Sequence, residues 1–189
     1  MKISSKGLDL IKHFESFKAK PYLCSNGTPT IGYGTTVYPT GQNVTLKNKA
    51  ISKEAAIKYL MYDCERFERQ VNQYFDDVSF KKLSQDEFDA CVSLCYNTGT
   101  IRWTCAAFLG ADLVGKKDVA DWWMKIIRNQ NGGTEDGLRR RRMSEIILIY
   151  TGELVYFANG SWDADRLAID KGEYMKDTGL KAYEELGLL

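Results

Sequence analysis

One short stretch of this chain has the residues of a β-hairpin, and helical patterns lie on both sides of it. Between Tyr22 and Gly34, β-forming residues are mixed with Asn26-Gly27 and Pro29. Elsewhere the apolar residues mostly recur at helical spacing. We therefore expect an α+β fold that is predominantly helical, with a small antiparallel sheet near the N-terminus rather than alternating βαβ units.

The helical patterns and the chain length predict one domain. The expected helices are 8–17, begun by a Ser4 or Ser5 cap and stopped by Pro21, then 52–74, 84–99 with a Ser84–Glu87 capping box, 106–114, 119–128 and 137–150. The 189 residues suffice for two lobes around a cleft. We expect a lobe with the sheet at about 1–50, a connecting helix at 51–75, a helical lobe at 76–150 and a C-terminal extension at 151–189, where Asn159-Gly160 suggests a second hairpin.

Composition excludes several classes of partner. A net charge of +1, from 26 basic and 25 acidic residues, gives no field that would select nucleic acid or an anionic membrane. Five cysteines without regular spacing predict reduced thiols and no metal site. Neither a signal peptide nor an apolar stretch of about 20 residues is visible, so we expect synthesis in the cytoplasm and no membrane segment.

Three residues near the hairpin form a candidate catalytic site. Glu15 lies near the end of the first expected helix, Cys24 precedes the turn and Thr30 follows it. Breaking a glycosidic bond needs a carboxylic acid that keeps its proton near neutral pH, and burial beside aromatic side chains favours the protonated form. An average glutamate is only a solvated residue on a helix face, so the assignment depends on context.

That context is a spacing. Eight residues separate Glu15 from Cys24, five separate Cys24 from Thr30, and residues 31–36 continue as Ile-Gly-Tyr-Gly-Thr-Thr. This resembles the phage-type lysozymes, glycoside hydrolase family 24, which are marked by a glutamate, an aspartate or cysteine, and a threonine at these intervals before a TIGYG segment. Residues 83–99 and 137–145 also resemble the family, so that the resemblance spans residues 6–150.

The resemblance implies a function and roles for residues. It implies an endolysin, a muramidase that cuts the β-1,4 bond between N-acetylmuramic acid and N-acetylglucosamine with inversion, as a monomer and without a cofactor. Glu15 would protonate the leaving oxygen, Cys24 and Thr30 would position the attacking water, and Tyr33, Asn97 and Arg142 would contact the substrate. Made in the host cytoplasm, the enzyme would reach the peptidoglycan through a holin-type pore.

The run Arg139–Arg142 is where the family places an arginine beside the catalytic glutamate. Four consecutive helical residues point in directions 100° apart and cannot form one phosphate-binding face. Arg139 and Arg142 share a face, so both can lean toward the cleft, and the sequence does not decide which arginine reaches Glu15.

The hairpin register decides whether Cys24 and Thr30 can act together. A two-residue turn at Asn26-Gly27 would point the two side chains to opposite faces. If both border one cleft, the connection must have an odd number of residues, with Gly27 left-handed in a bulged turn. We predict this bulged form.

Plainer readings and rival functions stay open beside these assignments. Cys24 can be a small buried hydrophobe and Thr30 a simple strand residue. We expect His13 to be a solvated surface residue, and we assign no site to Trp122 or Trp123, since such tryptophans usually belong to the core. The rival functions are a bacterial muramidase, used as an effector or in wall remodelling, and a peptidoglycan-binding module that lost turnover when cysteine replaced a carboxylate.

Overall fold

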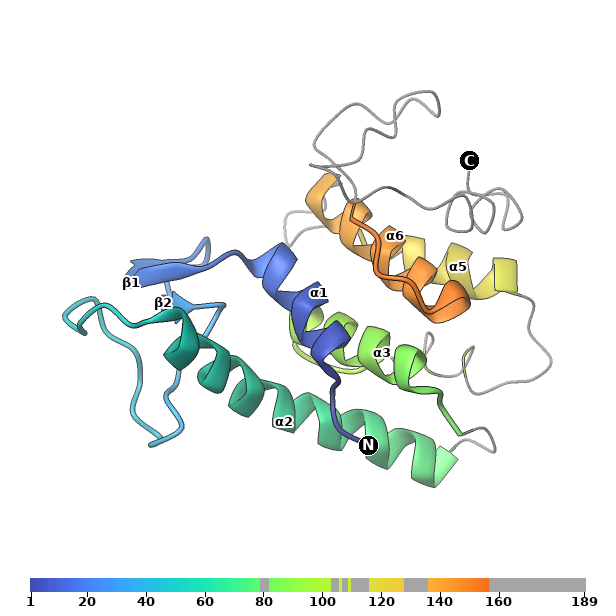
Figure 1. Ribbon diagram of the computed structural model, residues 1–189, viewed down its shortest axis with the longest axis horizontal. Helices are drawn as coiled ribbons and strands as arrows, with labels where there is room; N and C mark the ends of the chain where they lie inside the picture. The colour runs from blue at the N-terminus through green and yellow to red at the C-terminus, as the bar shows by residue number, and fades with distance from the viewer. Residues whose placement is uncertain (79–81, 103–105, 107–108, 110–115, 128–135, 157–189) are drawn as a thin grey trace.

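The computed structural model describes residues 1–78, 82–102, 106, 109, 116–127 and 136–156 (Figure 1). Its elements are α1 (Ser5–Glu15), β1 (Lys18–Leu23), β2 (Pro29–Gly32), α2 (Lys53–Val78), α3 (Gln85–Thr98), α5 (Lys116–Met124) and α6 (Asp136–Thr151). The expected α+β class, mostly helical with one small antiparallel sheet, is confirmed. Of the helix expected at 106–114 only residues 106 and 109 are described, and the hairpin expected at 159–160 lies outside the described residues.

Helix α3 is the centre of the helical part. It packs against α1, α2 and α6, and every residue from Glu87 to Cys95 is buried. The predicted capping box is present: the Ser84 hydroxyl accepts from the Glu87 amide, and the Glu87 carboxylate accepts from the Ser84 amide. The helix ends at Gly99, whose φ of 83° is left-handed as a C-cap requires.

Helix α1 is fixed to the helical part although it precedes the sheet in the chain. Its cap residue Ser4 accepts from the Gly7 amide, as predicted, while the Ser4 amide donates to Asp89 of α3 at 2.9 Å. Gly7 allows the close approach, because a Cβ there would lie 2.7 Å from the Asp89 carboxyl carbon. The last residue of α1, Glu15, is therefore held where the helices meet the sheet (Figure 1).

The end of α1 differs from the prediction. Pro21 does not stop the helix; it lies inside β1, where a missing amide is tolerated because each strand of a two-stranded sheet is an edge. The helix ends because Ser16 turns to φ 55° and ψ 144°. Among the described residues Ser16 is the only non-glycine residue with positive φ.

Helix α2 lies against both the sheet and the helices. The Ser52 hydroxyl accepts from the Ala55 amide and so begins the helix. Figure 1 shows α2 running from beside the sheet to beside α3, and it packs against both β2 and α3. No described helix combines the length and the apolar composition that crossing a membrane requires.

The conformation of Ser16 predicts a stabilising substitution. Because φ 55° with ψ 144° is a region that glycine tolerates and serine does not, Ser16→Gly should raise the free energy of unfolding by about 1 kcal/mol. Thermal unfolding should show a midpoint about 2–4 °C higher. Ser25→Gly, at an exposed turn position without positive φ, should give no increase; equal midpoints for both variants would contradict the prediction.

Candidate active site

The hairpin has the predicted bulged turn. Tyr22 pairs with Thr30, the Cys24 amide donates to the Thr28 carbonyl at 3.1 Å, and Gly27 has φ 80°. Residues 25–27 therefore form an odd-numbered connection, closed by a bond from the Gly27 amide to the Cys24 carbonyl. Because side chains alternate between faces along a strand, Cys24 and Thr30 lie on the same face.

The same-face residues border a cleft that also contains Glu15. The cleft has a volume of about 490 Å³. It is lined by Glu15, Tyr22, Cys24, Thr30, Gly34, Thr36, Val37, Tyr62, Asp63, Glu65, Arg66, Arg69, Tyr96 and Asn97. The structure thus brings Glu15, Cys24, Thr30 and Asn97 to one cleft, whereas Tyr33 and Arg142 are not part of its lining.

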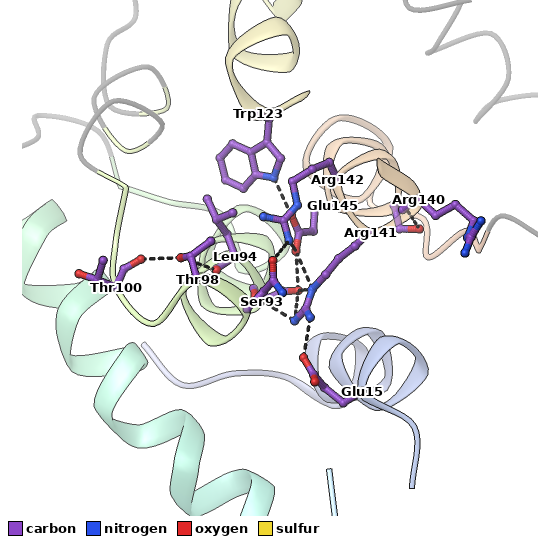
Figure 2. Close-up of polar contacts among 12 residues, drawn as sticks. Glu15, Ser93, Leu94, Thr98, Thr100, Trp123, Arg140, Arg141, Arg142 and Glu145 are labelled. Carbon is purple, nitrogen blue, oxygen red and sulfur yellow. Dashed lines mark hydrogen bonds and ion pairs between the residues drawn. The ribbon is translucent and has the colours of Figure 1, made fainter. Parts of the chain in front are cut away.

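Arg141 is the arginine that reaches Glu15. Its Nη1 donates to Glu15 Oε1 at 2.6 Å, and Figure 2 shows it reaching from α6 to the end of α1. The Glu15 side chain keeps 25% of its surface exposed, while that of Arg141 keeps 3%. The carboxyl group is therefore neither in open solvent nor sealed inside the protein.

Behind Arg141 lies a buried ionic cluster around Glu145. The Glu145 carboxylate, with no exposed surface, accepts from Ser93 Oγ and Trp123 Nε1, both at 2.7 Å, and from Arg141 Nε at 3.3 Å. Arg142 adds a bond of 3.2 Å from its Nη2 (Figure 2). Two cations and two neutral donors, Ser93 and Trp123, thus surround one buried carboxylate.

Arg142 and Tyr33, two of the three residues expected to contact the substrate, are buried in the structure. Arg142 is fully buried, since Glu145 and the Asn97 side-chain oxygen, at 2.9 Å, hold its guanidinium inside the protein. Tyr33 is 6% exposed, and its carbonyl accepts from the Tyr96 hydroxyl at 2.8 Å. Asn97 is the one of the three that lines the cleft.

Tyr96 is a largely buried residue of the cleft lining that holds the backbone at Tyr33. Burial raises the pKa of Tyr96 well above its ordinary value, and the charges of Asp63 and Glu15 raise it further, so the hydroxyl stays protonated and donates to the Tyr33 carbonyl. Gly34 has to be glycine here, because its φ is 111° and a Cβ would lie 3.1 Å from the Tyr96 oxygen.

The Cys24 thiol lies among several hydrogen-bond partners in and beside the turn. Burial raises the pKa of Cys24, but hydrogen bonds with Thr30 and with the Asn26 and Thr28 amides lower it by more, so the net pKa lies below its ordinary value. As a thiol, its Sγ donates to Asn26 Oδ1 at 2.8 Å. The Thr30 hydroxyl also donates to the Thr28 carbonyl at 3.0 Å.

Asp63 is a cleft carboxylate that sequence reasoning missed. It accepts from the Thr35 hydroxyl at 2.6 Å. Burial raises the pKa of Asp63, while the Thr35 hydrogen bond and the Arg66 charge partly oppose this rise. Thr35 belongs to the motif segment and Asp63 to an expected helix, but nothing in the sequence pairs them.

Other candidate groups lie outside the cleft lining. His13 is exposed, as expected, and stacks on Tyr156 with ring centroids 3.8 Å apart. Trp123 belongs to the core, whereas Trp122 is 37% exposed. In the described part of the chain no group of three or more His, Cys, Asp or Glu side chains could hold a metal ion.

A carboxyl group clamped at a helix end and a hairpin with two polar side chains face one cleft, an arrangement that fits a glycoside hydrolase of the lysozyme class. The chain belongs to the phage lysozyme family, whose sequence pattern it matches over residues 12–145.

Similar proteins agree with this family. The endolysin of Acyrthosiphon pisum secondary endosymbiont phage 1 is 32% identical over 154 residues, which cover 77% of this chain and 95% of the relative. The endolysin of Bacillus phage B103 is 33% identical, with 81% of this chain matched to 56% of that longer protein. The solved endolysin from Escherichia coli O157:H7 phage FAHEc1 superposes with a TM-score of 0.68 at 35% identity, covering 81% of this chain and 96% of that one.

The cluster around Glu145 predicts a large effect on stability. Glu145→Gln removes a fully buried carboxylate that pairs with Arg141 at 3.3 Å and with Arg142 at 3.0 Å, and so weakens the compensation of two buried cations; the free energy of unfolding should therefore fall by about 3–5 kcal/mol. The control is Glu65→Gln, since Glu65 forms an exposed pair with Arg69 at 3.9 Å and should change stability by less than about 0.5 kcal/mol. Chemical denaturation measures both variants, and similar values would show that the cluster contributes no more than a surface pair.

Proposed function

We propose that this protein is an endolysin that acts as a muramidase, hydrolysing the β-1,4 bond between N-acetylmuramic acid and N-acetylglucosamine in peptidoglycan with inversion and without a cofactor. The observation that carries the proposal is the placement of Glu15: it lines the cleft, is partly buried and is held by Arg141 at 2.6 Å. Cys24 and Thr30 border the same cleft.

Glu15 is the general acid in this mechanism. Arg141 binds its Oε1, and no residue in the described ranges donates a hydrogen bond to Oε2. Oε2 is therefore the oxygen that carries the proton and passes it to the glycosidic oxygen as the bond breaks. The bond from Arg141 to Oε1 orients the carboxyl group, and a group already held in the productive geometry loses less conformational entropy on reaction.

Cys24 and Thr30 act on the attacking water. Threonine can both accept from and donate to a water molecule, and the lowered pKa of Cys24 increases the fraction of thiolate that can accept the proton of the water. Water delivered from the hairpin while Glu15 protonates the opposite side of the linkage gives inversion at the anomeric carbon.

The biological setting proposed is lysis of the host cell at the end of a phage cycle. The enzyme is made in the host cytoplasm, acts as a monomer and reaches the wall through a holin-type pore. This setting is supported by the similar proteins, which are named endolysins.

Glu15→Gln tests the proposal. The amide keeps an oxygen for Arg141 but is not an acid that can transfer a proton near neutral pH. Clearing of purified peptidoglycan should therefore slow by a factor of about 10² to 10⁴. Binding to the same peptidoglycan, measured by co-sedimentation, should persist. The alternative is a binding module without turnover, which the thiol in place of a carboxylate favours. If the unmodified protein binds peptidoglycan but does not clear it, this alternative is correct.

The pH profile of Cys24 variants tests its role. The thiolate is the proposed active form, so the rate of the unmodified enzyme divided by that of Cys24→Ser should rise with pH through the Cys24 pKa, which lies below the ordinary thiol value. The serine hydroxyl does not ionise in this range, and proton transfer from Glu15 is common to both enzymes and cancels in the ratio. Compared with Cys24→Ser in the same way, Cys24→Asp should show its rise at acidic pH, where a carboxyl group ionises. A Cys24→Ser profile that matches the unmodified enzyme would assign water positioning to Thr30 alone.

A further inference from the structure

One wall of the cleft is a stripe of side chains on α2 that the mechanism does not use. Tyr62, Glu65, Arg66 and Arg69 all line the cleft. They lie three, four and seven positions after the first, which places them on one face of the helix. We call these four residues the α2 stripe.

The stripe is available to a ligand. Tyr62 is 45% exposed and the Arg69 side chain 72% exposed. Among the described residues Arg69 pairs with Glu65 alone, at 3.9 Å, and an exposed pair of this length contributes little. Arg66 forms no ion pair within the described part of the chain; its guanidinium lies 4.4 Å from the centre of the Phe67 ring.

The other acidic groups of the cleft are already engaged. Glu15 is bound by Arg141 and Asp63 by Thr35, and the charge of Arg66 acts on Asp63 without forming an ion pair. The two stripe arginines therefore present guanidinium groups, which bind planar carboxylates through paired hydrogen bonds. Tyr62, one turn before Arg66, offers an aromatic surface of the kind on which a sugar ring packs.

We propose that the α2 stripe binds the peptide-bearing sugar of the substrate, with Tyr62 against the ring and Arg66 and Arg69 on the carboxylates of the stem peptide. This inference rests on the proposed function, because it assigns part of the same cleft. It predicts that the enzyme distinguishes glycans with acidic stem peptides from the same glycans with neutral ones. The stripe is thus a specificity determinant, separate from proton transfer.

The test compares two forms of one soluble substrate: peptidoglycan fragments free of teichoic acid, with their stem carboxylates either intact or converted to carboxamides. Arg66→Gln/Arg69→Gln should raise KM for the carboxylate form about tenfold, equivalent to the loss of one charge-assisted interaction. The unmodified enzyme should prefer the carboxylate form over the carboxamide form. In the double variant this preference should be smaller by the same factor. Lys53→Gln/Lys58→Gln removes equal charge from exposed positions of α2 outside the cleft lining and should leave KM unchanged.

Binding measurements separate this inference from the proposed function. Calorimetric titration of Glu15→Gln protein with both fragments, with and without the two arginine substitutions, requires no turnover. Carboxylate-dependent affinity that disappears with the arginines supports the stripe even if the unmodified protein fails to cleave. Equal affinities for both fragments, or an equal loss in the lysine control, overturn the stripe even if cleavage is normal.

Discussion

The architecture of the site depends on one buried guanidinium. Arg141, on α6, donates to Glu15 at the end of α1, to Ser93 on α3 and to Glu145 one turn along its own helix. Removing such a cation from water is unfavourable, and several good partners are needed to offset the loss of solvation. The arrangement therefore contributes position more than stability: the acid can occupy only the place that the packing of three helices leaves for it.

This placement explains why a motif in the first 36 residues can define a site. Glu15 ends a helix anchored to α3, and only Ser16 and Phe17 separate it from β1. The hairpin that follows is fixed by its bulged turn, so two rigid elements joined by a short connection determine the distance across the cleft. The sequence spacing between Glu15 and the hairpin therefore sets how far Glu15 lies from Cys24 and Thr30. The chain turns from α1 into β1 at Ser16, whose backbone has positive φ.

The parts that the sequence predicted are those governed by local rules. The Ser4 cap, the Ser84 capping box and the odd-numbered hairpin follow from short-range hydrogen bonding, and each was predicted. The choice among the arginines was not predictable, because all residues from Arg141 to Ile149 are buried and the helix shows no alternation between polar and apolar faces. Which guanidinium meets Glu15 is decided by neighbouring helices that are distant in sequence. The Thr35–Asp63 contact was missed for the same reason.

The hairpin turn joins register to chemistry. The bulge that places Cys24 and Thr30 on one face also brings the Asn26 and Thr28 amides to the thiol, and these bonds, with Thr30, lower the Cys24 pKa below its ordinary value. A two-residue turn would separate the two side chains and change the relation of these amides to the sulfur. The backbone of the turn therefore favours ionisation of the thiol, and the register that fixes the face on which Cys24 lies also sets its electrostatic surroundings.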